Sequence, residues 1–214
     1  MGGVTVTDGK AAEKAAGGKR AVNMNEDKRA SETEFNDGFA PVIDENSEVL
    51  ILGSFPSVKS REVGFYYGNP QNRFWKTLAK WANEPELIKA DTNGKIEFLK
   101  KHKIALWDVI EKCAIAGSGD ADITEENSVP ADVNSVLCVP RDLKLIVCNG
   151  KKAYSVFLET VKNVSVKTIY LPSTSSANPR FNEKEWQAAL DSVFAPESLS
   201  ESSPEADNEK PDKI

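Results

Sequence analysis

Four short apolar runs recur along the middle of the chain, and each ends in glycine or polar residues. Their length and nearly continuous apolar character are typical of strands buried on both faces. Segments with helical spacing lie between them, so the order of elements predicts a parallel sheet covered by helices. The runs are "EVLILGS" (48–54), "KIALWDVI" (103–110), "LKLIVCNG" (143–150) and "VKTIYLP" (166–172).

Helix signals fill the intervals between these runs. In "RFWKTLAKWA", for example, Phe74, Leu78 and Trp81 recur at helical spacing. The prediction is therefore an α/β fold, a three-layer sandwich with a central, mostly parallel four-stranded sheet flanked by helices. The expected helices cover 73–82, 91–102, 151–161 and 182–194, with a small one closing at 134–140.

The two ends of the chain differ from its middle in composition. Residues 1–34 lack hydrophobic periodicity and are rich in Gly, Ala, Lys and Glu. Residues 196–214 are rich in Pro and Ser and hold 2 basic and 6 acidic side chains. Neither end can bury enough apolar surface to offset its ordering entropy. We expect two disordered tails around a single domain at 35–195.

Composition narrows the classes of function. No apolar run approaches the ~20 residues of a membrane-spanning helix. Three cysteines without CxxC spacing and a single histidine disfavour a zinc or iron–sulfur site, so we expect no metal and no cofactor. Reduced thiols favour an intracellular protein, of nucleus or cytoplasm. The nearly neutral middle of the chain does not indicate nucleic-acid binding by itself, although a local phosphate-contacting patch would suffice.

Polar residues gather where the predicted strands end. In open parallel sheets ligands bind at the carboxyl ends of the strands, so this edge is the expected site. The loop Gly53–Ser57 lacks the spacing of a nucleotide-binding loop, and no GxSxG motif accompanies the lone His102. Asp108, Asp120 and Asp122 could at best hold magnesium. The four strand ends read "GSFPS", "WDVI", "CNGKK" and "PSTSSAN".

The segment "FYYGNPQNRFW" (65–75) concentrates aromatic rings and amides in one loop. An amide can orient a water or hydrogen-bond to the edge of a base, and a ring beside it can stack on a flat ligand. Phe74 and Trp75 lie on the predicted helix and are expected in the core. For Tyr67, in the loop, a core role and a functional role both fit the composition.

Two stretches resemble the motifs of a known family. "VLILGSFPSVKSREVGFYYGNPQNRFWKTL" resembles the first motif region of the uracil-DNA glycosylase superfamily, and "IYLPSTSSANPR" resembles the second. "KIALWDVIEKCAIAGSGDADI" and "IVCNGKKAYSVF" are most similar to the hypoxanthine-DNA glycosylase branch, related to the mismatch-specific uracil glycosylases. The resemblance covers residues 39–194. It implies a hydrolase of base excision repair that acts on DNA and needs no cofactor.

The resemblance also implies roles for single residues. Most relatives have Asp, Asn or Glu at the third position of the first motif to orient the attacking water, and here that position is Phe55. In the hypoxanthine branch the catalytic amide corresponds to Asn72, with Asn69 as the competing amide. Tyr67 corresponds to the aromatic side chain that stacks on the flipped base. Backbone groups near Ser54 and Phe55, together with Asn149, would contact the polar edge of the base.

Further residues are expected to hold the DNA backbone. Hydroxyls and amides after the fourth strand would contact the phosphates beside the lesion, although a flexible Ser/Thr turn is the alternative. Lys151, Lys152 and Arg180 fit phosphate contacts and solvated surface charge equally well. Asp120 and Asp122 match an acidic stretch of the branch and receive no role. The expected phosphate contacts after the fourth strand are Ser173, Thr174, Ser175, Ser176 and Asn178.

Several hypotheses for the function stay open at this point. The leading one is a monomeric, monofunctional glycosylase that excises hypoxanthine, with uracil or xanthine as rival bases. Because Phe55 replaces the usual amide or carboxylate, a module that binds damaged DNA without cutting it is an alternative of another class. A small-molecule hydrolase acting on nucleosides is the third.

Overall fold

The computed structural model describes residues 34–195, and four of its strands form one parallel sheet. The order across the sheet is β3-β2-β6-β7, with every neighbouring pair parallel. Each strand falls within one of the four apolar runs of the sequence, so the predicted fold class is confirmed. The strands are β2 (Val49–Gly53), β3 (Ile104–Asp108), β6 (Leu145–Asn149) and β7 (Lys167–Leu171).

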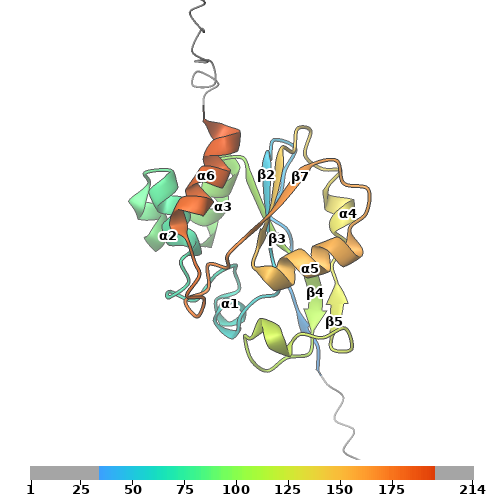
Figure 1. Cartoon of the computed structure of the whole chain (residues 1–214). Coiled ribbons are helices and arrows are strands. Elements are labelled where there is room, and N and C mark those ends of the chain that lie inside the picture. Colours follow the sequence, from blue (N-terminus) through green and yellow to red (C-terminus); the bar gives the residue numbers. More distant parts are fainter. Residues whose placement is uncertain (1–33, 196–214) are drawn as a thin grey trace, which may run out of the picture. The chain divides into compact units, whose positions relative to one another are not determined.

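Helices cover both faces of this sheet (Figure 1). One face carries α2 (Phe74–Trp81), α3 (Thr92–Lys101) and α6 (Glu183–Phe194), and the other carries α4 (Val133–Val136) and α5 (Lys151–Thr160). The helices expected from the sequence are therefore all present. The two faces arise because successive side chains of a strand point in opposite directions.

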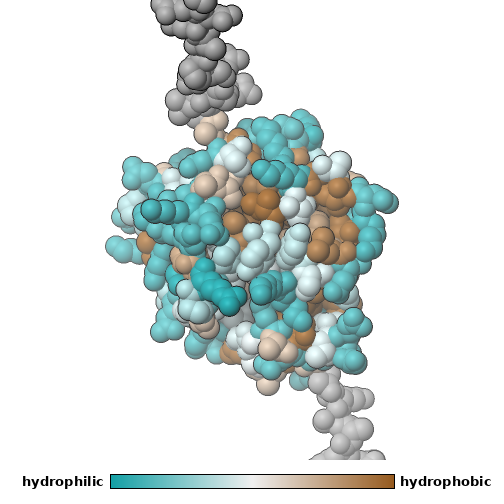
Figure 2. Space-filling model, viewed as in Figure 1, coloured by the Kyte–Doolittle hydropathy of each residue, from teal (hydrophilic) through white to brown (hydrophobic). Residues whose placement is uncertain are grey.

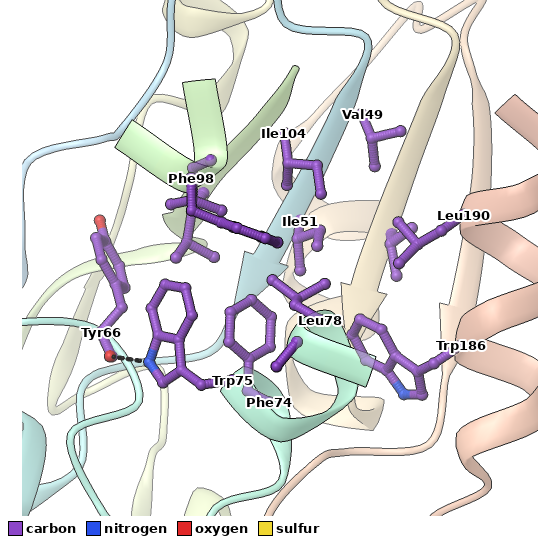
Figure 3. Packing of buried hydrophobic residues seen from close by; sticks show 14 of the residues in the cluster. Val49, Ile51, Tyr66, Phe74, Trp75, Leu78, Phe98, Ile104, Trp186 and Leu190 are labelled. Atoms are coloured by element: carbon purple, nitrogen blue, oxygen red, sulfur yellow. Dashed lines mark hydrogen bonds between the residues drawn. The ribbon is translucent and has the colours of Figure 1, made fainter. Parts of the chain in front are cut away.

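The central strand β2 serves both cores at once. Val49 and Ile51 pack toward α2, α3 and α6, whereas Leu50 and Leu52 pack toward α4 and α5. Figure 3 shows the first core, where Phe74 lies among Ile51, Leu78 and Trp186. Phe74 is fully buried. In the same core Trp75 Nε1 donates to the carbonyl of Tyr66 at 3.1 Å, so both aromatic residues lie in the core, as predicted.

A second, antiparallel sheet was not predicted. It consists of β1 (Asn36–Asp37), β4 (Ile110–Cys113) and β5 (Ser128–Pro130), in the order β1-β4-β5. The run "KIALWDVI", expected as one strand, leaves the main sheet after Asp108 and enters this small sheet at Ile110. Strands of two to four residues are too short to show a clear alternation of apolar and polar side chains.

Three short helical segments complete the described residues. They are α1 (Val58–Val63) and the 3₁₀ helices η1 (Pro85–Lys89) and η2 (Asp120–Asp122). The Ser57 hydroxyl caps α1 by accepting from Ser60 N at 3.2 Å, and Gly64 ends it in the left-handed conformation. This pair of caps fixes the path of the chain between β2 and the aromatic loop.

The surface in the view of Figure 2 is mostly hydrophilic, with apolar patches between α6 and α5 around the edge strand β7. Within residues 34–195 no helix is long and apolar enough to cross a membrane. The tails expected at 1–34 and 196–214 lie outside the described residues, apart from Glu34.

Candidate active site

A cavity of about 240 Å³ opens at the carboxyl ends of the parallel strands. We call it the strand-end cavity. Its walls come from the loop after β2, the aromatic loop before α2, the ends of β3 and β6, and the loop after β7. The expected site residues that line it are Ser54, Phe55, Tyr67, Asn72, Asn149, Ser173 and Ser175.

Tyr67 is held from two directions. Phe74 stacks on one face of its ring, with centroids 3.9 Å apart and planes at 20°. Asn149 Nδ2 donates to its hydroxyl at 2.9 Å. Burial, and then the nearby Asp108 carboxylate, raise the pKa of Tyr67 well above its usual value, so the phenol stays protonated. Since Phe74 covers one face, the opposite face of the ring is the one available to a flat ligand.

The backbone of Tyr67 is also unusual. Its φ of 51° lies in the left-handed region, which bulky residues rarely adopt. Such a conformation persists only where surrounding contacts enforce it, and such outliers cluster at functional sites. The stacking on Phe74 and the hydrogen bond from Asn149 are the contacts that enforce it here.

Asn149 is part of a buried hydrogen-bond network rather than a free group. Its Nδ2 donates to the Tyr67 hydroxyl and, at 3.0 Å, to Thr174 Oγ1, and its Oδ1 accepts from Thr174 N at 2.9 Å. Both N–H bonds of the amide are thus used within the protein. Thr174 has no exposed surface. Its expected contact with phosphate is therefore corrected: this side chain anchors Asn149 instead.

Replacing Asn149 by alanine tests this network. The Asn149→Ala variant leaves the buried Thr174 N–H and the two hydroxyls without their partner, and an unsatisfied buried group costs about 1–3 kcal/mol. We expect the free energy of unfolding, measured by urea titration, to fall by roughly 2–3 kcal/mol. The exposed Asn134→Ala in α4 is the matched control and should change it by less than about 0.5 kcal/mol. An equal, small change in both variants would contradict the network.

Asn72 and Asn69 differ in their relation to the cavity. Asn72 lines it, and Asn72 Oδ1 accepts from Phe74 N at 3.0 Å, which fixes the side chain at the start of α2. This bond uses one of the two lone pairs of the oxygen, so Oδ1 can still accept from a water. Asn69 Oδ1 accepts from Gln71 N at 3.0 Å, and Asn69 is not among the described residues that line the cavity.

The loop that contains η2 forms another wall of the cavity. Ser54 Oγ donates to Asp120 Oδ1 at 2.6 Å, and Ser118 Oγ accepts from Val58 N at 2.9 Å. Lys152 Nζ donates to the carbonyl of Ile123 at 2.9 Å, so this lysine ties α5 to the loop. The amide N–H of Phe55 has no acceptor within residues 34–195.

Asp108, at the end of β3, places a carboxyl group in the wall of the same cavity. It lies opposite Gly53 in the sheet register, and a Cβ at Gly53 would come within 2.3 Å of Asp108 Oδ1. Only glycine leaves room for the carboxyl there. Burial, and then Asp120, raise the pKa of Asp108 to about 7. From the sequence alone, Asp108 was one of three carboxylates that could at best hold magnesium.

A second hollow of about 350 Å³ adjoins the strand-end cavity and shares Ser173 with it. Lys151, Asn178 and Arg180 also line this hollow, so together with Ser173 the structure brings four expected DNA contacts together there. Ser176 lines neither hollow and is exposed. Gly150 precedes α5 at a φ of 107°, where a Cβ would press on Ser173 at 3.1 Å.

Arg73 anchors the loop after β7 and was not predicted. Its Nη2 donates to the carbonyls of Ser175 and, at 2.8 Å, Asn178, and its guanidinium lies 4.4 Å from the ring centroid of Phe181. Arg73 N also donates to Thr174 O at 3.0 Å. Arg73 thereby joins the two sequence motifs, since it directly precedes α2 and binds the Ser/Thr loop.

Comparison with known proteins finds a family match that covers nearly all of the described residues. The profile of the uracil DNA glycosylase superfamily matches residues 40–193. The chain belongs to the uracil-DNA glycosylase superfamily. This membership confirms the resemblance of the two motif regions, and the superfamily profile spans every wall of the strand-end cavity.

Individual proteins are also similar to this chain over most of its length. A Methanosarcina acetivorans protein named hypoxanthine DNA glycosylase is 38% identical over 156 residues, which is 72% of this chain and 96% of that protein. A Methanosarcina barkeri protein of the same name is 37% identical over 143 residues, or 67% of this chain and 88% of that protein. An NMR structure from Methanosarcina acetivorans, provisionally assigned as a uracil DNA glycosylase, superposes with a TM-score of 0.65 at 36% identity, covering 75% of this chain and 99% of that one.

Among the described residues, no three His, Cys, Asp or Glu side chains come together as metal ligands do. Two acidic residues, Asp108 and Asp120, do share the cavity, together with two tyrosines and two asparagines. The arrangement can therefore hold a flat polar ligand by stacking and hydrogen bonding, and can position a water beside it.

Proposed function

We propose that this chain is a monofunctional DNA glycosylase of base excision repair that hydrolyses the N-glycosidic bond of hypoxanthine in DNA. One observation carries the proposal: Tyr67, whose ring is covered by Phe74 on one face, and Asn72 line the same cavity at the carboxyl edge of the sheet. The reaction needs a ring that stacks on the flat base and, close to it, an amide that holds water beside the sugar carbon. Superfamily membership and the names of the two relatives support the reaction class and the base.

In this proposal the damaged nucleotide leaves the duplex and its base enters the strand-end cavity. Extrusion costs a few kcal/mol, less for a mispaired base. The base stacks on Tyr67, and the unpaired N–H of Phe55 donates to its polar edge. Asn149 holds Tyr67 in place through the hydroxyl, so its contribution to base recognition is positioning.

Cleavage develops positive charge on the sugar and negative charge on the departing base. Asn72 holds the water that attacks the sugar carbon, where position matters more than base strength because the carbon is strongly electrophilic. Donors fixed in the cavity before reaction stabilise the charge on the base. No lysine is among the described residues of the cavity wall, which favours a glycosylase that leaves the DNA strand intact.

An excision assay tests the proposal. Labelled duplexes carrying hypoxanthine, uracil or xanthine are incubated with the full chain, and strand breaks are compared before and after hot alkali. We expect breaks only after alkali and fastest with hypoxanthine. Faster release of uracil or xanthine would show that the enzyme prefers that base to hypoxanthine. Duplex binding without any excision would establish the non-catalytic module instead, and cleavage of nucleosides but not duplexes would establish a small-molecule hydrolase.

The hollow beside the cavity is proposed to hold a phosphate next to the lesion, through Lys151, Arg180 and Asn178. We expect Lys151→Ala and Arg180→Ala each to weaken duplex binding for every sequence tested. Each should lower the slope of log K against log salt concentration by about 1. Lys100→Ala, an exposed change on α3, is the control. An unchanged salt slope in both variants would remove these residues from the DNA interface.

The proposal extends to the domain boundaries and the oligomeric state of the chain. Residues 35–195 form the glycosylase domain, and 1–34 and 196–214 are proposed as tails without a catalytic part. We propose that the enzyme acts on DNA inside the cell as a monomer, since one chain can supply every residue assigned to the cavity.

A further inference from the structure

Asp108 differs from the other polar groups of the strand-end cavity because one oxygen of its carboxyl group, Oδ2, is buried without a partner among residues 34–195. The residue is only 4% exposed, and no donor within residues 34–195 reaches its Oδ2. Buried polar atoms are nearly always hydrogen-bonded, so such an exception calls for a role. The carboxyl lies in the cavity wall over Gly53, close to the Tyr67 hydroxyl.

The surroundings of Asp108 favour its neutral form. The ionisable groups that act on it are Tyr66 and Tyr67, from the aromatic loop, and Asp120, from η2. The two phenols are neutral and Asp120 carries a negative charge, so the described residues offer no cation to pair with an ionised Asp108. Burial and Asp120 bring the pKa of this carboxyl to about 7. A general acid works best when its pKa lies near the working pH.

We propose that Asp108 is the general acid that protonates the departing purine. This assignment rests on the proposed function, because it needs a purine base in the strand-end cavity. An unpaired carboxylic acid is suited to the task since its O–H is not already donated to a protein acceptor. Asn72 and Asp108 line the same cavity and divide the chemistry, one acting on the water and the other on the base.

The Asp108 O–H gives its proton to N7 of hypoxanthine while the bond between C1′ and N9 breaks, and the bonding pair goes to the purine ring. The base leaves neutral, Asp108 becomes a carboxylate, and the sugar becomes positively charged. The water held by Asn72 forms the new bond to C1′ and releases a proton to solvent. Asp108 takes a proton from solvent after the base departs. The new carboxylate appears as the sugar charge develops, so the two charges attract.

Asp108→Asn tests this role, because the amide keeps the shape of the side chain but cannot transfer a proton. Single-turnover excision of hypoxanthine should fall by about 10²-fold or more. The wild-type rate should decline as pH rises above about 7, the pKa of Asp108, and this decline should be absent from the variant. Binding to a duplex with a non-cleavable hypoxanthine analogue should change by less than about 3-fold, which shows that the variant folds. Asp142→Asn, on the exposed surface, should behave as wild type.

A modified substrate gives a second test of the proton transfer to N7. With 7-deazahypoxanthine, which has carbon in place of N7, wild type should slow to nearly the rate of Asp108→Asn, and the variant should lose little more. The assignment is overturned if Asp108→Asn keeps the wild-type rate, or keeps the same pH profile at a lower rate. In either case excision by wild type leaves the proposed function standing. If wild type excises no deaminated base, both the proposed function and this assignment fail.

Discussion

Asn72→Ala is expected to lower the single-turnover rate of hypoxanthine excision by roughly 100-fold or more, with little change in duplex binding. The alanine removes the only side-chain carbonyl assigned to hold the water, and a misplaced reactant by itself costs on the order of 100-fold. Because Asn72 Oδ1 also accepts from Phe74 N, some loss of stability at the start of α2 accompanies the change. Urea titration of Asn72→Ala measures this loss of stability separately from the loss of rate.

Asn69→Ala is the matched control for this prediction. Asn69 belongs to the same loop but is not among the described residues that line the cavity, and its side chain accepts only from Gln71 N within residues 34–195, while its backbone carbonyl, which accepts from Asn72 N, is unchanged by the substitution. The control should excise hypoxanthine within about 3-fold of wild type, since surface changes outside a site have small effects. If Asn69→Ala were inactive and Asn72→Ala active, the catalytic role would belong to Asn69.

The second large effect is expected in the pH dependence of folding stability. Asp108 has its pKa raised from 3.8 to about 7 in the folded chain. Below about pH 4 the carboxyl is protonated whether folded or unfolded, so it adds no pH dependence. As pH rises toward 7 the unfolded chain releases this proton while the folded chain retains it. Stability therefore falls over that window, by on the order of 4 kcal/mol.

Asp108→Asn should remove this fall. Other carboxyl groups change the stability of both proteins alike, so the informative quantity is the difference between wild type and variant across pH 4 to 7 in urea titrations. Wild type should lose stability relative to the variant as pH rises and stop losing it above about pH 7. Parallel curves would show that the carboxyl ionises in the folded chain as it does in water. This measurement is independent of any activity.

The main sheet could be predicted because its central strands β2 and β6 are buried along their whole length and β3 is buried at all but one position, although the edge strand β7 is largely exposed or half-buried. "VLILG" and "LIVCN" are buried at every position, which leaves a continuous apolar signal in the sequence. The small sheet could not be predicted, because β4 is buried only at its two ends and β5 has three residues. Its pairing depends on contacts between segments far apart in the chain, such as Asn36 with Cys113.

Some residues of the candidate site could likewise be predicted from the sequence, and others could not. Tyr67 and Asn72 were singled out by their loop and by the family motif, and Ser54, Phe55 and Asn149 by their places at strand ends. Asp108 also ends a strand, but nothing in the sequence shows that its carboxyl is buried without a partner. Nor does the sequence show that Arg73 reaches across to Ser175 and Asn178. Both facts depend on how the strands and loops meet in space.

A structure of the full chain bound to a duplex that carries a non-cleavable hypoxanthine analogue would show where the base binds. We expect the flipped base on the face of the Tyr67 ring opposite Phe74, with Asp108 within hydrogen-bond distance of N7 and the Asn72 amide beside C1′. A base that remains stacked in the duplex would contradict this expectation. So would a base bound away from the strand-end cavity, for example in the hollow between Trp81 and His102 at the far side of the fold.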